Sequence, residues 1–252
     1  MSGDAADAGR GRTLAALVDH TALGPGTTPA DVERLCREAV EHGFAAVCVN
    51  PVHVPRAASE LAGASVAVAT VVSFPLGAHA PGQKAREARE ALEMGAGELD
   101  VVADLAALRQ ERWATLEREV RAVADEAEGK ALVKVILETA ALEPRQILKA
   151  ARVAAGSGAD FVKTSTGFHP AGGATAEAVA LLRTGAGPGV GVKASGGIRT
   201  CEDALRMVAS GATRIGTSSG LVLAGCTDPL PEPLERYLED GAASRESGRA
   251  GP

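Results

Sequence analysis

The chain has 252 residues, of which 46% are hydrophobic and 23% charged, and its formal net charge is -6. This composition is typical of a globular protein with a sizeable core, and the acidic balance argues against nucleic acid or an anionic membrane surface as a partner. No apolar run is long enough to span a bilayer, and the N-terminal segment lacks the apolar core of a signal peptide. A cytoplasmic location is therefore expected.

Short apolar runs rich in β-branched residues alternate along the chain with segments of helical periodicity, which indicates repeated βα units and a parallel sheet. Eight runs are expected to form strands: 16–21, 45–50, 65–74, 98–104, 131–139, 160–166, 190–195 and 213–219. Amphipathic helices are expected within 28–43, 81–97, 109–129, 143–158, 173–187 and 200–212, and 229–241 is expected to supply the last helix.

This alternation favours a single (β/α)8 TIM barrel over an open doubly wound sheet. An open sheet would more naturally carry a glycine-rich dinucleotide turn after its first strand, and VDHTALGPGTT matches that motif only weakly. We expect one catalytic barrel domain over residues 13–241, with disordered tails at 1–12 and 242–252.

The cysteines and histidines give no sign of a metal site. Cys36, Cys48, Cys201 and Cys226 are scattered without a C-x-x-C pair, so they are interpreted as reduced, mostly buried thiols and not as zinc ligands or a disulfide framework. The five histidines form no H-E-x-x-H or similar ligand pattern. We therefore expect neither a metal nor another cofactor.

Lysine is scarce, because only 6 of the 26 basic residues are lysines. Three of them, Lys134, Lys163 and Lys193, nevertheless lie inside or at the ends of apolar runs: ALVKVILET, DFVKTSTGF and VGVKASGGIR. A buried lysine is uncommon and destabilising unless its ammonium is paired or its pKa is lowered. These three lysines are therefore candidates for chemistry.

Barrel active sites lie where strands end and the following loops begin. On the predicted strands, that face would display the hydroxyls of GTSSG together with Asp19, Asn50, Asp100, Asp104, Glu138, Lys163 and Lys193. The segments KASGGIRT and GTSSG follow the seventh and eighth strands, where barrels often bind phosphate through backbone N–H groups. The alternative is that they are two ordinary glycine-rich turns.

Lys163 and Lys193 end adjacent predicted strands, so each ammonium would make the charge of the other less favourable. A lysine amine attacks a carbonyl only when it is unprotonated, and a neighbouring cation or burial lowers its pKa enough for that. Asp100 could serve a proton relay beside them. The alternatives are structural ion pairs with Asp100 or Glu138, or a lysine that simply holds a phosphate.

An ordered series of segments from about residue 16 to 220 resembles the deoxyribose-phosphate aldolase (deoxyriboaldolase) family: VDHTAL, AAVCVNP, TVVSFPLG, GELDVV, VKVILET, FVKTSTGF, VKASGGIRT and RIGTSSG. The resemblance implies a class I aldolase, independent of metal and cofactor. Such an enzyme reversibly cleaves 2-deoxy-D-ribose 5-phosphate to acetaldehyde and D-glyceraldehyde 3-phosphate in deoxyribonucleoside catabolism. It also implies a homodimer or homotetramer whose other partners are these small molecules.

By the same resemblance, Lys163 would form the Schiff base, Lys193 would depress its pKa and Asp100 would relay protons through water. The resemblance further implies a network supported by Asp19 and Lys134, and a phosphate site made of Gly167, Gly196, Gly197, Ser218 and Ser219. This chain departs from other members at three points. Many carry a lysine where it has Gly24, and some carry one where it has Phe168. Some end in a tyrosine, whereas the only tyrosine of this chain is Tyr237.

Two other functions remain open on the sequence. One is a Schiff-base barrel that acts on a different sugar phosphate. The other is a barrel that binds a phosphorylated ligand and senses it without turnover.

Overall fold

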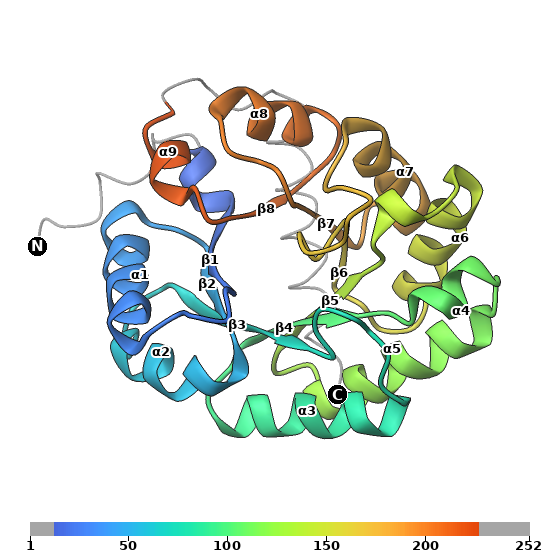
Figure 1. Ribbon diagram of the computed structural model, residues 1–252, viewed down its shortest axis with the longest axis horizontal. Helices are drawn as coiled ribbons and strands as arrows, with labels where there is room; N and C mark the ends of the chain where they lie inside the picture. The colour runs from blue at the N-terminus through green and yellow to red at the C-terminus, as the bar shows by residue number, and fades with distance from the viewer. Residues whose placement is uncertain (1–12, 227–252) are drawn as a thin grey trace, which may run out of the picture.

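The computed structural model of the protein describes residues 13–226, and eight parallel strands close into a barrel at its centre (Figure 1). Each strand pairs with its sequence neighbours, and β8 pairs with β1 to complete the closure. The strands are β1 (Val18–Ala22), β2 (Ala46–Val49), β3 (Ala67–Val72), β4 (Glu98–Val102), β5 (Leu132–Ile136), β6 (Phe161–Lys163), β7 (Gly191–Ser195) and β8 (Arg214–Thr217). The predicted (β/α)8 barrel is confirmed.

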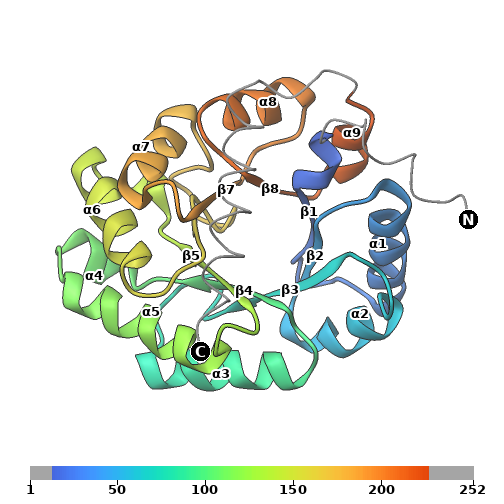
Figure 2. The same ribbon diagram turned by 180° about the vertical axis from the view of Figure 1, so that it is seen from behind.

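Helices form an outer layer around the strands, as the view from behind also shows (Figure 2). They are α1 (Pro29–His42), α2 (Val54–Glu60), α3 (Pro81–Glu93), α4 (Leu105–Arg109), α5 (Trp113–Ala127), α6 (Pro144–Ala155), α7 (Ala176–Ala186), α8 (Cys201–Ala209) and α9 (Gly220–Ala224). Three 3-10 helices join them: η1 (Leu14–Leu17), η2 (Pro51–His53) and η3 (Thr139–Ala141).

All six helices expected within the described residues are present, and α5 accounts for the one expected over 109–129. Helices α2, α4 and α9 were not predicted. The chain turns between α4 and α5 through Glu111, whose φ is 56°. The expected helix at 229–241 and the tails at 1–12 and 242–252 lie outside the described residues.

The helix ends follow the expected local chemistry. Thr28 accepts a hydrogen bond from the Asp31 N–H, and the Asp31 carboxylate accepts one from the Thr28 N–H, so that the two residues form a capping box at the start of α1. The helix stops at Gly43, which adopts a left-handed conformation with φ of 67°. Thr200 and Asp203 make the same box at the start of α8. These caps fix where each helix leaves the neighbouring strand.

Strand alternation divides the protein into two cores. Outward residues such as Leu99, Val133 and Val192 pack against the helices in one large cluster. A much smaller apolar cluster around Ala46, Cys48, Ala69 and Val71 lies on β2 and β3. The inward positions of β1, β4, β5, β7 and β8 instead carry charged side chains. The strands therefore position charged groups inside the barrel.

Two of the cysteines correct the expectation of reduced thiols. Cys201, the first residue of α8, and Cys226, which follows α9, form a disulfide with Cα atoms 5.9 Å apart. They are 25 residues apart in sequence, and β8 lies between them, so spacing alone did not reveal the pair. Cys36 and Cys48 are free and buried, as expected.

A buried lysine that was not predicted, Lys84 of α3, lies in the helical layer. Its Nζ is 3.1 Å from Oε1 of Glu119 on α5 and donates to the carbonyl of Val102 at 2.8 Å. Burial lowers the pKa of Lys84 and raises the pKa of Glu119, and each opposes the shift of the other. The Glu119 carboxylate also accepts the Asp104 N–H at 3.1 Å. The pair therefore ties α3 and α5 to the end of β4.

Replacing Lys84 with methionine should destabilise the protein by about 3 kcal/mol, because it leaves the buried Glu119 carboxylate without its cation. The double variant Lys84→Met/Glu119→Gln should recover much of that loss, since neither side chain then carries a charge. Urea unfolding of both variants measures the difference. Equal stability of the single and double variants would show that the ion pair does not hold α3 and α5.

Candidate active site

Six charged side chains inside the barrel form a closed ring in which positive and negative groups alternate. We call this set the charged ring: Asp19, Glu98, Asp100, Lys134, Lys193 and Arg214. On one side, Arg214 Nη1 lies 2.7 Å from Asp19 Oδ1, and the other oxygen of Asp19 accepts a hydrogen bond from Lys193 Nζ. Lys193 Nζ then donates to Asp100 Oδ2 at 2.7 Å.

The other side of the charged ring runs back from Asp100 to Arg214. Lys134 Nζ lies 2.8 Å from Asp100 Oδ1 and 2.6 Å from Glu98 Oε2. Glu98 Oε1 is 3.2 Å from Arg214 Nη2, which closes the ring. Glu98, Asp100, Lys134 and Lys193 are all buried, and the Arg214 side chain is only 12% exposed. Buried charges of this kind are tolerated because each one is paired.

Lys163 is attached to the charged ring without belonging to it. Its Nζ donates to Asp100 Oδ2 at 2.6 Å, the same oxygen that Lys193 contacts, and the two lysines are register partners on β6 and β7. The expected adjacency of these two lysines is confirmed. So is the alternative of an ion pair with Asp100, and the two interpretations are compatible.

The electrostatics distinguish the two lysines. Burial lowers the pKa of Lys163, the Lys193 ammonium lowers it further, and Asp100 opposes them without reversing the shift. Burial also opposes the charge of Lys193, but Asp100 and Asp19 together raise the pKa of Lys193 above its usual value. Lys193 is therefore a fixed cation, while Lys163 loses its proton more readily than an ordinary lysine.

Asp100 is the carboxylate on which these amines converge. Burial alone would raise its pKa, but the ammonium groups of Lys134, Lys163 and Lys193 outweigh that effect and hold the pKa of Asp100 well below its usual value. The charged ring contains three carboxylates and three cations. The cluster is consequently neutral when Lys163 is unprotonated.

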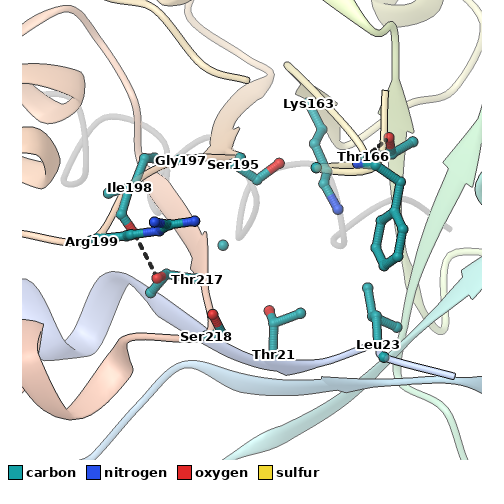
Figure 3. Close-up of a pocket in the computed structure, with 15 residues that line it drawn as sticks. Thr21, Leu23, Lys163, Thr166, Ser195, Gly197, Ile198, Arg199, Thr217 and Ser218 are labelled. Atoms are coloured by element: carbon teal, nitrogen blue, oxygen red, sulfur yellow. Dashed lines mark hydrogen bonds between the residues drawn. The ribbon is translucent and has the colours of Figure 1, made fainter. Parts of the chain in front are cut away.

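A cavity of about 270 Å³ opens at the carboxyl ends of the strands, and Lys163 lies in its lining. Figure 3 shows the Lys163 amine and the Arg199 guanidinium pointing into this space from opposite sides. Other lining residues come from the last residues of β1, β7 and β8 and from the loops after β1, β6, β7 and β8: Thr21, Leu23, Gly24, Thr166, Gly167, Phe168, Ser195, Gly196, Gly197, Ile198, Gly216, Thr217 and Ser218. The same cavity is therefore lined by the Lys163 amine and by a glycine-rich wall formed by Gly196 and Gly197.

The backbone conformation and packing of the glycine-rich wall require glycine at these positions. Gly196 and Gly197 have φ of 89° and 83°, which favour residues without a side chain. Gly173 packs so closely on this turn that an added Cβ would lie 2.1 Å from the Gly196 carbonyl oxygen, which accepts the Ala174 N–H at 3.0 Å. The turn is therefore held in place with its backbone exposed to the cavity, as anion binding requires.

Most of the predicted phosphate residues line this cavity, namely Gly167, Gly196, Gly197 and Ser218. Ser219 is not in the lining, and its N–H instead donates to Thr217 Oγ1 at 2.9 Å. Gly24 and Phe168, the two departures from the family pattern, lie in the lining as well. Phe168 packs edge-on against Phe74, with ring centroids 5.2 Å apart.

Asn50, Asp104 and Glu138, which were also expected at this face, neither line the cavity nor belong to the charged ring. Glu138 accepts the Thr166 hydroxyl at 2.6 Å and so holds the loop after β6, without pairing with a lysine. Asp104 accepts the Ala107 N–H at 3.0 Å and caps α4. Asn50 precedes η2. All three follow the carboxyl ends of their strands, β2, β4 and β5, and the Asp104 and Glu138 carboxylates are used in these structural hydrogen bonds.

Sequence reasoning missed Glu98 and Arg214 of the charged ring and Arg199 of the cavity. Glu98 stands two positions before Asp100 on the same strand, so alternation alone places it on the same face. Arg214 likewise stands two positions before Gly216 on β8, so the two residues share the inward face of that strand. Arg199 lies inside KASGGIRT, whose glycines had been considered without their cation.

Within residues 13–226, no group of three or more histidine, cysteine, aspartate or glutamate side chains is arranged to hold a metal ion. The helices of the same range include none that is long and apolar enough to cross a membrane.

Comparisons with known proteins agree with this geometry. The deoxyribose-phosphate aldolase of Listeria monocytogenes serotype 4a is 51% identical over 217 residues, which cover 86% of this chain and 97% of its own. A Bacillus licheniformis protein named deoxyribose-phosphate aldolase 2 is 52% identical over 83% of this chain and 93% of its own. The tetrameric deoxyribose phosphate aldolase structure from Aeropyrum pernix has a TM-score of 0.78 and 38% identity, and the match covers 84% of this chain and 89% of that one. A family model described as DeoC/LacD family aldolase matches residues 13–224, and the chain therefore belongs to this family of aldolases.

Proposed function

We propose that the protein is a class I aldolase that reversibly cleaves 2-deoxy-D-ribose 5-phosphate to acetaldehyde and D-glyceraldehyde 3-phosphate, with Lys163 as the Schiff-base lysine. The observation that carries the proposal is the cavity in which the Lys163 amine faces a glycine-rich, cationic wall. Relatives named deoxyribose-phosphate aldolase at about 51% identity support the choice of substrate. The reaction belongs to deoxyribonucleoside catabolism in the cytoplasm.

The reaction begins with the free amine of Lys163. Its nitrogen attacks the aldehyde carbon C1 of the open-chain sugar, and the resulting carbinolamine takes up one proton at its hydroxyl and loses water, which leaves a protonated imine. Burial and the adjacent Lys193 ammonium favour the unprotonated amine that this attack needs. Because Lys193 remains charged, it does not compete with Lys163 as a nucleophile.

Cleavage then uses the imine as the electron sink. The C3 hydroxyl loses its proton, the C2–C3 bond breaks, and its electron pair moves into the imine to give an enamine on Lys163. The C3 carbon leaves as the aldehyde of glyceraldehyde 3-phosphate. Protonation at C2 and hydrolysis of the imine release acetaldehyde. We assign the proton transfers to Asp100 acting through water, with Asp19 and Lys134 supporting it.

The phosphate would bind at the opposite end of the cavity. Gly196, Gly197 and Ser218 offer backbone N–H groups and a hydroxyl, and Gly167 lies close by. Arg199 adds a guanidinium directed at the same space (Figure 3). This cation is a counter-charge for the phosphate in a chain that has Gly24 and Phe168 where some members of the family carry lysines. Ser219 remains a predicted contributor, although it does not line the cavity.

We also propose that the enzyme is a homodimer or homotetramer. Support comes from the Aeropyrum pernix relative, whose structure is described as tetrameric.

Borohydride reduction in the presence of deoxyribose 5-phosphate or acetaldehyde should trap a covalent adduct on Lys163, because the imine forms at that amine. Peptide mass mapping locates the modified residue. An adduct on Lys193 or Lys134 would keep the enzyme class but overturn the residue roles. No adduct, beside an active related aldolase treated in parallel, would favour a ligand-binding protein. A panel of aldehydes would separate this activity from cleavage of another sugar phosphate.

Lys193→Leu should lose most of the activity near neutral pH while the protein stays folded. Removing the fixed ammonium raises the pKa of Lys163, so less free amine is present at pH 7 and the acid limb of the rate profile moves to higher pH. The pH dependence of kcat/KM and a circular dichroism spectrum provide the measurement. Full rate at neutral pH would contradict the two-lysine mechanism.

Arg199→Met should raise KM for deoxyribose 5-phosphate by about tenfold, since a charge-assisted contact with the phosphate is lost. KM for unphosphorylated deoxyribose should change little. Arg206→Met is the matched control, because Arg206 lies on α8, the helix that follows Arg199, and pairs with the exposed Glu202. Equal effects on both sugars would place the phosphate elsewhere.

A further inference from the structure

We infer that Arg214 and Glu98 are positioning residues that set the net charge of the charged ring and thereby keep Lys163 in its unprotonated, nucleophilic form. The inference rests on the proposed role of Lys163 as the Schiff-base lysine. Neither residue lines the cavity, so any effect they have on the reaction must pass through the other members of the ring.

Both residues lie at the entry of their strands, away from the reacting end. Glu98 is the first residue of β4, and Arg214 is the first residue of β8. Arg214 contacts both Asp19 and Glu98 and also lies over the ring of Phe161, 5.5 Å from its centroid. Its guanidinium therefore bridges the two halves of the ring at the end opposite to Lys163.

Charge balance gives this bridge its effect. With Arg214 present, three cations neutralise three carboxylates, and a proton on Lys163 would add an uncompensated positive charge. Without Arg214, the ring would have one carboxylate in excess, and a proton on Lys163 would restore neutrality. Removing the Glu98 carboxylate has the opposite effect: it leaves the ring with one cation in excess, so that a proton on Lys163 becomes less favourable. Because charges in a buried site are weakly screened, these effects reach Lys163 through the ring.

No other group described around Lys163 supplies a further negative charge that could neutralise a proton on its amine. Asp100 is its direct partner, and Lys193 shares the same carboxylate oxygen. Burial raises the pKa of the Cys48 thiol to about 11, so that thiol is neutral near pH 7. The Glu138 carboxylate is bound to Thr166. The remaining charged groups on the barrel strands are members of the charged ring itself: Asp19, Glu98, Lys134 and Arg214.

Opposite pH shifts in two variants test the inference. In Arg214→Met, the acid limb of kcat/KM for cleavage of deoxyribose 5-phosphate should move to higher pH, with about a tenfold fall in kcat/KM at pH 7. In Glu98→Gln, the same limb should move to lower pH. The double variant Arg214→Met/Glu98→Gln is again neutral with Lys163 unprotonated, and its limb should return to the wild-type position.

Conservative and distant variants serve as controls. Arg214→Lys keeps the positive charge and should keep the limb close to the wild-type pH, even if the shorter side chain lowers stability. Arg89 and Glu126 form a two-contact pair of the same residue types on the surface, at 2.9 and 2.6 Å. Arg89→Met and Glu126→Gln should leave the limb unmoved.

Borohydride trapping on the wild-type enzyme separates the two possible failures. If no adduct forms on Lys163, the proposed function is wrong. If Lys163 is trapped but the two variants leave the limb in place, or move it in the same direction, Arg214 and Glu98 are structural and the inference is overturned. If Arg214→Met does not fold, Glu98→Gln decides alone, because a loss of structure lowers the rate without moving the limb to lower pH.

Discussion

The site depends on one buried carboxylate that binds three ammonium groups. Asp100 holds Lys134 with one oxygen and both Lys163 and Lys193 with the other. Without these cations the carboxylate would be too unfavourable to bury, and without the carboxylate three lysines would repel one another in the barrel centre. Stability and chemistry therefore rest on the same contacts. The arrangement is tolerated because Asp19 and Glu98 complete the pairing of the fixed cations.

A closed barrel is well suited to such a cluster. Parallel strands expose alternate residues to the interior, so strands far apart in sequence bring their inward side chains together. Asp19 and Arg214, which contact each other, are 195 positions apart. The apolar residues of β2 and β3 occupy the other side of the interior. This division gives the lysines a low-dielectric environment, in which one extra charge has a large effect.

The features of the site that could be predicted from the sequence are those that depend on residues close together in the chain. Strand-end lysines among apolar neighbours, such as Lys163, are visible in the sequence, and the barrel rule places them at one face. The alternation in β4 could also have identified Glu98. The contact between Glu98 and Arg214 could not be predicted from the sequence, because it depends on the strand register from β4 to β8. Lys84 was missed because its helix looks polar throughout, and the Cys201–Cys226 disulfide depends on how α9 returns to α8.

The choice between lysine and arginine follows the geometry of the cluster. Three cations must meet around Asp100, and the compact ammonium of lysine allows two of them to share a single oxygen. Arg214 has a different task, since it must reach Asp19 with one terminal nitrogen and Glu98 with the other, and the planar fork of a guanidinium spans such a gap. Only lysine can also give up its proton near neutral pH. At the centre of the barrel, a chain that otherwise prefers arginine therefore places lysine where charges must crowd or where an amine must be released.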